Sequence, residues 1–233
     1  MARDRKTSGD DGSRMRFERV RSARGRRLSS TRWLQRQLND PYVQAAKRDG
    51  YRSRAAYKLL HIDERFDLLT PGKRVVDLGA APGGWTQIAV DRVESEDDAK
   101  LVVAIDVLEM EPLAGAEILV GDIEDEAAVA RLRKAIGAPV DLVLSDMATS
   151  TTGHASTDHL RTLALAEAAL VFACEVLVPG GGFVTKVFQG ADEPALFAAM
   201  TKKFHSVRRF KPKASRSDSV EMFLVATGFK DAG

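Results

Sequence analysis

The sequence predicts an α/β fold in which a mostly parallel sheet is covered by helices on both faces. From residue 74 onward, short apolar runs typical of strands alternate with longer segments typical of helices. The first run ends in a glycine-rich turn, VVDLGAAPGGWTQ at residues 75–87, as in ligand-binding strand–turn–helix units. A length of 233 residues and a hydrophobic content of 44% suit one domain with a sizeable core.

The elements before the sheet differ in character. Residues 1–30 contain Arg, Ser and Gly but almost no aliphatic residues, so we expect a disordered basic extension. Residues 31–69 mix apolar and basic residues, and two helices are expected there, the second beginning near Ser53, which could cap it. Four apolar residues share one face of this second helix: Ala55, Leu59, Ile62 and Phe66. Lys58 borders that buried face.

After the PGK turn at 71–73 the elements of the sheet follow in order. The expected strands are 74–78, 101–106, 118–120, 140–145, 183–187, 207–210 and 221–226, with helices near 85–93, 126–136, 160–177 and 193–204. If the last strand runs antiparallel beside 183–187, the sheet has seven strands with only the last reversed. Residues 31–233 are therefore predicted to form a single domain, with the helices of 31–69 at its start.

Charge is segregated along the chain, although the net charge is only +2. Residues 1–66 carry 18 Lys and Arg against 8 Asp and Glu, whereas the rest carries 17 against 25. A second basic stretch, residues 202–216, has seven basic and no acidic residues. Two basic ends around an acidic middle favour a polyanion as partner, and an ordinary solvated surface is the alternative.

The chain has no sequence feature of a membrane or secreted protein. Its longest apolar stretch, 163–178, is interrupted by Glu167 and Glu175, so no membrane span is expected. The arginine-rich start lacks the apolar core of a secretory signal. A single cysteine, Cys174, suits a reducing compartment, and we therefore expect a cytoplasmic protein. The four histidines show no metal-ligand spacing, so no metal is predicted.

The glycine loop predicts the class of ligand. It lacks the second glycine of G-x-G-x-x-G, which lets a pyrophosphate approach the backbone, and this argues against a nicotinamide dehydrogenase. Asp106 ends the second strand, about 27 residues after Gly79, where an acid can bind ribose hydroxyls, and Asp122 follows the third strand. A ligand with ribose and adenine but no phosphate fits this set, namely S-adenosylmethionine. The alternative is a tight turn with incidental acids.

Lys186 lies in the stretch FVTKVFQG, which otherwise has the pattern of a buried strand. A buried ammonium requires a carboxylate partner or a shifted pKa. Asp146 ends the neighbouring strand, and Glu221 begins the last one, which returns to the same edge if it is antiparallel. We expect these side chains to converge there, with Lys58 entering from the preceding helix.

Six stretches along the chain resemble those of a known family. The stretches RWLQRQ, GYRSRAAYKL, VVDLGAAPGGW, SDMA, TKVFQG and VEMFLVATG occur in the order found in the RrmJ/FtsJ-type (RlmE) 23S ribosomal RNA 2′-O-ribose methyltransferases. The resemblance implies an S-adenosylmethionine-dependent methyltransferase fold. It places the family's catalytic tetrad on Lys58, Asp146, Lys186 and Glu221. It also places cofactor contacts on Gly83, Trp85, Asp106, Asp122 and Asp146, in addition to Gly79 of the loop.

The resemblance also implies the reaction and its partner. The expected activity is 2′-O-methylation of a uridine in large-subunit ribosomal RNA within the assembled 50S subunit, by a protein taken to be a monomer. It assigns Lys186 as the acceptor of the hydroxyl proton, and a charged Lys186 would instead orient the hydroxyl. One departure is that the family's D-M-A-P-N is D-M-A-T-S here, with Thr149 and Ser150 in place of Pro and Asn.

Other functions remain open from the residues alone. The same chemistry on transfer RNA or a messenger RNA cap is one alternative, and a non-catalytic RNA-binding assembly factor is another. The basic segments 31–58 and 202–216 are expected to contact RNA phosphates. Three aromatic residues of the first segment could stack on bases or serve as packing anchors: Trp33, Tyr42 and Tyr51.

Overall fold

The computed structural model describes residues 28–148, 154–190 and 193–230. Its helices are α1 (Leu28–Leu38), α2 (Pro41–Asp49), α3 (Ala56–Phe66), α4 (Gly84–Val93), α5 (Glu126–Ile136), α6 (Ala155–Val176) and α7 (Glu193–Lys203). Its strands are β1 (Val75–Leu78), β2 (Val102–Asp106), β3 (Ala116–Val120), β4 (Val140–Ser145), β5 (Leu177–Phe188), β6 (Phe204–Phe210) and β7 (Glu221–Phe229). Every predicted strand is present.

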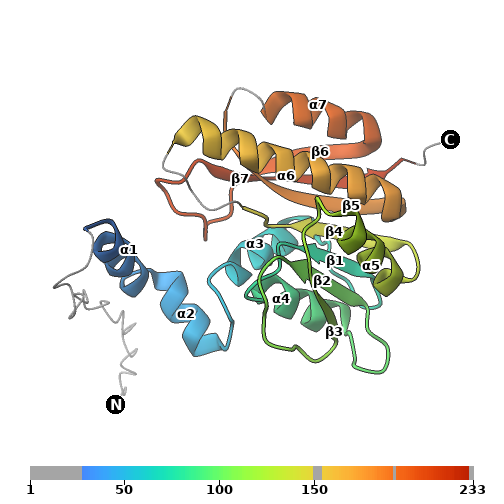
Figure 1. Ribbon diagram of the computed structural model, residues 1–233, viewed down its shortest axis with the longest axis horizontal. Helices are drawn as coiled ribbons and strands as arrows, with labels where there is room; N and C mark the ends of the chain where they lie inside the picture. Colours follow the sequence, from blue (N-terminus) through green and yellow to red (C-terminus); the bar gives the residue numbers. More distant parts are fainter. Residues whose placement is uncertain (1–27, 149–153, 191–192, 231–233) are drawn as a thin grey trace, which may run out of the picture. The chain divides into compact units, whose positions relative to one another are not determined.

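The strands form one seven-stranded sheet in the order β3-β2-β1-β4-β5-β7-β6 (Figure 1). The pairs from β3 through β5 are parallel. The last strand, β7, is antiparallel to both β5 and β6, between which it is inserted. The predicted sheet, mostly parallel with the last strand reversed, is confirmed.

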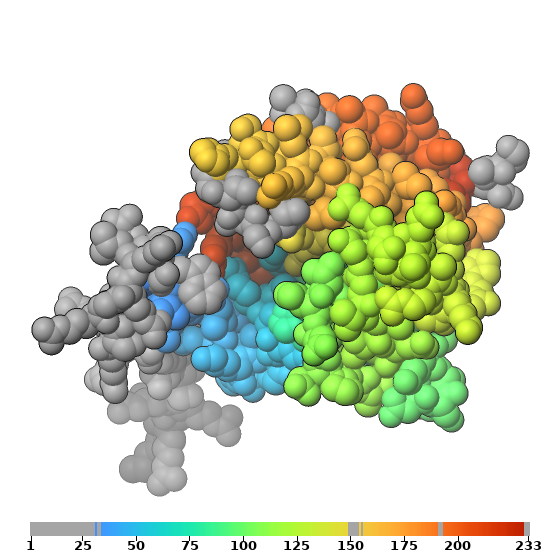
Figure 2. All heavy atoms as spheres, viewed as in Figure 1, coloured from blue at the N-terminus to red at the C-terminus, as the bar shows by residue number. Residues whose placement is uncertain are grey.

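Two hydrophobic cores show that helices cover both faces of the sheet. One core joins the strands to apolar residues of α5, α6 and α7, such as Leu132, Ala169 and Met200. The other joins them to α3 and α4 through residues such as Leu59 and Ile88. On the face seen in Figure 2, the green segment that includes α5 lies beside the yellow and orange α6. A parallel sheet needs this double cover because both of its faces are apolar.

The start of the described chain holds the helices α1 and α2, ahead of α3. The described part of the chain divides into two compact units, with the boundary between Ala45 and Ala46. The first unit contains α1, which begins inside the segment 1–30 that was predicted to be disordered; residues 1–27 lie outside the described part of the chain. Asp40 shapes the turn between α1 and α2, because its carboxylate accepts the Tyr42 N–H at 3.0 Å.

The predicted cap at Ser53 is wrong. Helix α3 begins at Ala56 after Ala55, which makes no side-chain cap bond. The segment before α3 instead binds α4, because the Arg52 N–H donates to Gln87 Oε1 at 2.7 Å. Ser53 packs against the first residue of α4, where a Cβ on Gly84 would lie 2.4 Å from its hydroxyl oxygen. These contacts join residues distant in the sequence, and no local pattern reveals them.

Strand β5 is longer than predicted, beginning at Leu177 rather than at residue 183. The sequence VPGGG breaks the apolar pattern there. Pairing with β4 nevertheless continues across it, from Leu142 opposite Gly182 to Val140 opposite Leu177, with one irregularity between. Backbone hydrogen bonds to a neighbouring strand therefore extend an element whose own residues favour a turn.

Asp77 is the charged residue in the middle of β1, with no exposed surface. Thr86 Oγ1 donates to its Oδ2 at 2.7 Å, while Oδ1 has no partner among the described residues. Burial raises the pKa of Asp77 to about 7; the Thr86 hydrogen bond opposes the rise, and the carboxylates of Asp146 and Asp106 add to it. The core beneath the glycine loop therefore favours a protonated carboxyl group.

This burial predicts a pH-dependent stability. Asp77 holds its proton in the folded state up to about pH 7, but loses it near pH 4 once unfolded, so its stabilising effect falls as the pH rises between these values. We expect the free energy of unfolding of Asp77→Asn, measured in urea, to rise relative to that of the wild type by about 1.4 kcal/mol per pH unit in this window. A difference that does not change with pH would contradict the expectation.

Candidate active site

Three charged side chains converge at the carboxyl ends of the central strands. Asp146 directly follows β4, whose last residue, Ser145, pairs with Thr185 in β5, so Asp146 and Lys186 lie at the same level. Glu221 begins the antiparallel β7 opposite Phe188, near the end of β5. The antiparallel direction of β7 thus brings Glu221 back to the edge where the parallel strands end.

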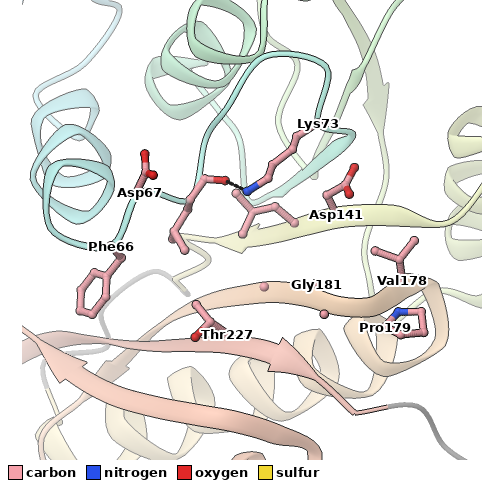
Figure 3. Close-up of a pocket in the computed structure, with 12 residues that line it drawn as sticks. Phe66, Asp67, Lys73, Asp141, Val178, Pro179, Gly181 and Thr227 are labelled. Carbon is pink, nitrogen blue, oxygen red and sulfur yellow. Dashed lines mark hydrogen bonds between the residues drawn. The ribbon is translucent and has the colours of Figure 1, made fainter.

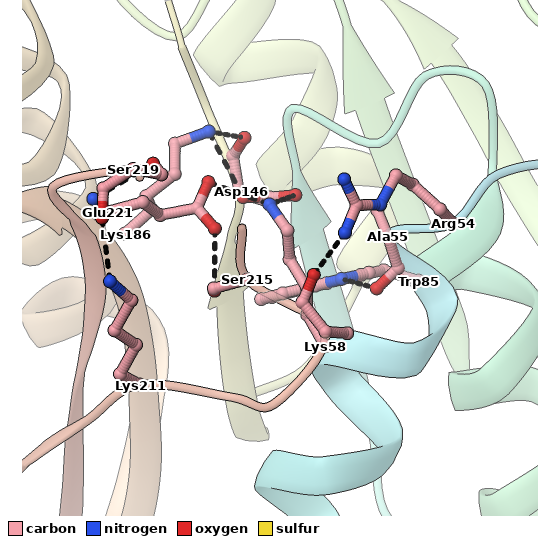
Figure 4. A network of polar contacts seen from close by, with 11 residues as sticks. Arg54, Ala55, Lys58, Trp85, Asp146, Lys186, Lys211, Ser215, Ser219 and Glu221 are labelled. Carbon is pink, nitrogen blue, oxygen red and sulfur yellow. Dashed lines mark hydrogen bonds and ion pairs between the residues drawn. The ribbon is translucent and has the colours of Figure 1, made fainter. Parts of the chain in front are cut away.

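Lys58 from α3 completes a four-residue cluster of Lys58, Asp146, Lys186 and Glu221 (Figure 4). Lys58 Nζ lies 2.7 Å from Glu221 Oε2 and 3.6 Å from Asp146 Oδ2. Lys186 Nζ lies 3.1 Å from Asp146 Oδ1 and donates to the backbone carbonyl of Asp146 at 2.7 Å. Asp146 is therefore shared by both lysines, and Glu221 binds only one of them in this arrangement.

The cluster is largely shielded from water. The side chain of Lys186 is 6% exposed, and those of the other three members are each 13% exposed. Burial works against the charged form of Lys58, but attraction to Asp146 and Glu221 outweighs it and raises the pKa of Lys58. Burial likewise opposes the ionised Asp146, but Lys186 and Lys58 hold the pKa of Asp146 below its usual value. The charged forms therefore stabilise one another.

Ser215, a residue that sequence reasoning missed, holds Glu221 in place. Ser215 Oγ donates to Glu221 Oε1 at 2.9 Å, so each carboxylate oxygen has its own partner. Ser215 is 8% exposed and belongs to the segment between β6 and β7. This segment is fixed at both backbone groups of one residue: the Ala214 N–H donates to Nδ1 of His61 in α3, and Arg54, just before α3, donates to the Ala214 carbonyl.

Removing the Ser215 hydroxyl should weaken catalysis without affecting the cofactor. In Ser215→Ala one oxygen of Glu221 loses its donor, and hydrogen bonds to charged groups contribute about 1.5–3 kcal/mol. We expect kcat for methyl transfer to fall about tenfold, with the Kd for S-adenosylmethionine unchanged. Ser219→Ala is the matched control, because Ser219 Oγ accepts the backbone N–H of Glu221 and does not touch its carboxylate. An equal fall in both variants would contradict this role of Ser215.

A cavity of about 590 Å³ adjoins the cluster. It lies between the glycine loop, the ends of β2 and β3, and α6, and Asp146 belongs to both cavity and cluster. Gly79, Asp106 and Asp122 line it as well. Asp106 also organises the walls, because Oδ2 accepts the Ala81 N–H at 2.9 Å and Oδ1 accepts the Leu108 N–H at 2.8 Å.

Gly79 must be a glycine to form this wall. Its φ is +75°, and a Cβ there would lie 2.6–2.9 Å from side-chain and backbone atoms of Met147. The loop after β1 and the loop after β4 thus touch at the floor of the cavity, which brings Asp146 next to the glycine loop.

Two predicted cofactor residues do not line the cavity. Gly83 is buried beneath Arg52, and the Trp85 side chain is 2% exposed in the core between α3, α4 and the sheet. The Trp85 indole N–H donates to the Ala55 carbonyl at 2.8 Å, and its ring packs against Phe223. Sequence reasoning missed several residues that do line it: Val107, Leu108, Ile123, Met147, Arg161 and Leu165. Val107 and Leu108 directly follow Asp106, and these two apolar side chains are 60% and 65% exposed, as expected of surfaces that a ligand would cover.

A second cavity, of about 320 Å³, lies at the opposite edge of the sheet (Figure 3). It is bordered by the turn after α3, including Asp67, and by Gly180, Gly181 and Gly182 of β5. Its lysine, Lys73, already donates to the Leu68 carbonyl at 2.7 Å. None of the predicted site residues lines this cavity.

Comparison with known proteins identifies the family. The model of the FtsJ-like methyltransferase family matches residues 51–229. The chain belongs to the FtsJ-like methyltransferase family. The match spans α3, the whole sheet and all four cluster residues. The chain is therefore a methyltransferase, and the predicted fold class and enzyme class are confirmed.

Individual relatives agree with this family. A Rhodospirillum rubrum protein is 60% identical over 224 residues, 96% of this chain and 85% of its own length. One from Paramagnetospirillum magneticum is 58% identical over 221 residues, 94% and 91% of the two chains. Both are named ribosomal RNA large subunit methyltransferase E. Among solved structures, a Plasmodium falciparum protein described as a ribosomal RNA methyltransferase superposes with a TM-score of 0.67 at 29% identity, covering 77% of this chain and 98% of that one.

Two other kinds of feature are absent from the described residues. Across residues 28–148, 154–190 and 193–230, no helix is long and apolar enough to cross a membrane. The same ranges contain no group of three or more histidines, cysteines and carboxylates that could hold a metal ion. The Thr149–Ser150 departure from the family pattern lies outside the described residues.

Proposed function

We propose that the protein transfers a methyl group from S-adenosylmethionine to the ribose 2′-oxygen of a uridine in large-subunit ribosomal RNA, within the assembled subunit. It would act in the cytoplasm and as a monomer. The observation that carries the proposal is Asp146, which lines the 590 Å³ cavity and forms ion pairs with both lysines of the cluster. A cofactor cavity and a group of proton-handling residues thus adjoin at a single carboxylate.

The cavity suits S-adenosylmethionine better than a dinucleotide. Its lining contains four carboxylates, from Asp106, Asp122, Glu124 and Asp146, against one guanidinium, from Arg161. Such a lining attracts a cationic sulfonium and repels a pyrophosphate. Asp106 stands at the end of β2, where an acid can bind ribose hydroxyls, and apolar side chains such as Val107 and Ile123 offer surfaces for an adenine.

The four-residue cluster can take up the proton of the ribose 2′-hydroxyl and stabilise charge on its oxygen. When bound, S-adenosylmethionine supplies an activated methyl group on a sulfonium. We assign Lys186, acting as the neutral amine, as the acceptor of the ribose hydroxyl proton, which it takes up as the oxygen forms its bond to the methyl carbon. The Asp146 carbonyl and carboxylate orient the Lys186 amine toward the acceptor. Lys58, held by Glu221, stabilises negative charge developing on the oxygen.

The RNA partner is supported by relatives and by charge. Curated relatives at 51–60% identity are named for large-subunit ribosomal RNA. The segments 31–58 and 202–216 supply lysines and arginines for binding phosphates, apart from Arg52 and the cluster residue Lys58. Tyr51 meets Tyr57 edge to face at 5.5 Å and packs on the core, which favours its role as an anchor over base stacking. The side chain of Trp33 lies outside the described residues.

The test compares acceptors of different classes. Labelled S-adenosylmethionine is offered with large ribosomal subunits lacking the modification, with protein-free ribosomal RNA, and with transfer RNA. We expect label in the subunits, on a 2′-O-methyluridine after digestion to nucleosides. Label confined to transfer RNA would support methyl transfer but would contradict ribosomal RNA as the acceptor. Absence of label from all three, with intact cofactor binding, would favour a non-catalytic assembly factor.

A further inference from the structure

The guanidinium of Arg52 joins two loops that come from different parts of the chain. Its NH1 donates to the Glu111 carbonyl at 2.7 Å and to the Pro82 carbonyl at 3.4 Å. Its NH2 donates to the Pro112 carbonyl at 2.7 Å. All three acceptors are backbone atoms, so the contacts fix the path of the two loops whatever side chains they carry.

Both loops form walls of the 590 Å³ cavity. The glycine loop contributes Gly79 and Ala81, and the segment that follows β2 contributes Val107 and Leu108. Arg52 binds the glycine loop at Pro82, directly after the lining residue Ala81, and the second loop at Glu111 and Pro112, beyond the lining residue Leu108, but it does not itself line the cavity. It therefore acts on the shape of the cavity without belonging to its surface.

The fit of Arg52 explains why residue 83 is glycine. A Cβ on Gly83 would lie 2.8 Å from Arg52 NH1 and 3.0 Å from its Cδ, and the φ of +108° is one that L side chains rarely adopt. Met110 Sδ lies 3.5 Å from the same point, so the second loop closes over the glycine as well. The backbone of Arg52 is held in turn by Gln87, whose amide donates to the Gly50 carbonyl at 3.1 Å.

We propose that Arg52 is a positioning residue of the cofactor site, which holds the glycine loop and the segment 107–113 together, and is not a phosphate-binding residue of the RNA surface. The inference rests on the proposed cofactor, S-adenosylmethionine. It gives one arginine of the basic N-terminal region a role that its charge alone does not suggest.

The chemistry of arginine makes this inference distinguishable from RNA binding. A planar guanidinium reaches acceptors on two loops at once, whereas a lysine ammonium is a compact charge on a flexible stem. A phosphate contact is preserved to a large extent by lysine, because it depends on charge. A bridge between Pro82 and Pro112 is not preserved, because one ammonium does not span the same acceptors.

The test uses Arg52→Lys and Arg52→Met in the full chain, with Arg92→Lys as control on the partly exposed end of α4. Calorimetric titration with S-adenosylmethionine should show a Kd raised about tenfold or more in both Arg52 variants and unchanged in the control. Amide hydrogen exchange should be faster in residues 107–113 of both variants while the strands keep their protection, which shows that they remain folded.

The opposite pattern would overturn the inference. One such result is that Arg52→Lys binds S-adenosylmethionine like the wild type, while Arg52→Met binds RNA more weakly and the salt dependence of its RNA binding falls by about one counterion. Arg52 would then be a phosphate contact. Equal cofactor affinity in all variants with unchanged exchange in 107–113 would also overturn it. A wild-type protein that does not bind S-adenosylmethionine would instead refute the proposed cofactor, and this inference with it.

Discussion

Replacing Lys186 with alanine is expected to lower the single-turnover rate of methyl transfer by about 10²–10⁴-fold, the range that general acid–base catalysis contributes. The amine lies 3.1 Å from an Asp146 carboxylate oxygen and 2.7 Å from its carbonyl, and no other member of the cluster holds this position. Because Lys186 does not line the 590 Å³ cavity, the Kd for S-adenosylmethionine should change less than about threefold.

Lys186→Arg separates the two roles that a lysine can have here. Arginine keeps the positive charge but does not give up a proton in proteins, so it cannot accept one from the hydroxyl. We expect this variant to be as inactive as Lys186→Ala. If it keeps a substantial part of the wild-type rate, Lys186 orients the acceptor by charge, and the assignment as proton acceptor is wrong. Equal loss of cofactor binding and transfer in Lys186→Ala would instead indicate a structural ion pair.

Removing the carboxylate of Asp146 should destabilise the fold as well as abolish transfer. In Asp146→Asn, Lys58 and Lys186 lose the carboxylate that they share in a site that is 6–13% exposed, and Glu221, which pairs with Lys58, is the remaining carboxylate of the cluster. Breaking a buried ion pair by removing one partner costs about 3–5 kcal/mol. We expect a loss of this order in the free energy of unfolding at pH 7, measured in urea.

A matched substitution provides the control for this effect. Asp122→Asn makes the same change in the same cavity, but Asp122 is exposed, so its effect on stability should stay within about 0.5 kcal/mol. The pH dependence gives a second check. The pKa of Asp146 is lowered by folding, so its contribution is present above the unfolded value near 4 and is lost as the pH falls through the folded value. A deficit that persists unchanged in acid would contradict the ion-pair account.

The sheet could be predicted because its determinants are local. Each strand is a short apolar run, and alternation with helices selects a parallel sheet, so the order of elements and the meeting of Asp146 with Lys186 follow from the chain itself. The place of Glu221 depended on β7 being antiparallel, which the structure shows. A lysine in an apolar strand was informative because burial demands a partner.

The remaining parts of the site depend on contacts between distant residues. Ser53 has the residue type of a helix cap, but docking of Arg52 and Ser53 onto α4 moves the start of α3 to Ala56. The position of Trp85 directly after the glycine loop gave no sign that its indole is buried against Phe223. Ser215, Arg161 and the carbonyl contacts of Arg52 likewise carry no pattern in the sequence, because serines and arginines occur at many solvated positions.

The most direct test of the central claim is a crystal structure with S-adenosylhomocysteine bound, since the claim is that the cavity and the four-residue cluster form one active site. The account predicts that the ribose hydroxyls bind Asp106 and that the sulfur faces the side of the cavity where Asp146 meets Lys186. A ligand whose sulfur points away from Asp146, or one bound at the opposite edge of the sheet beside Lys73, would contradict it.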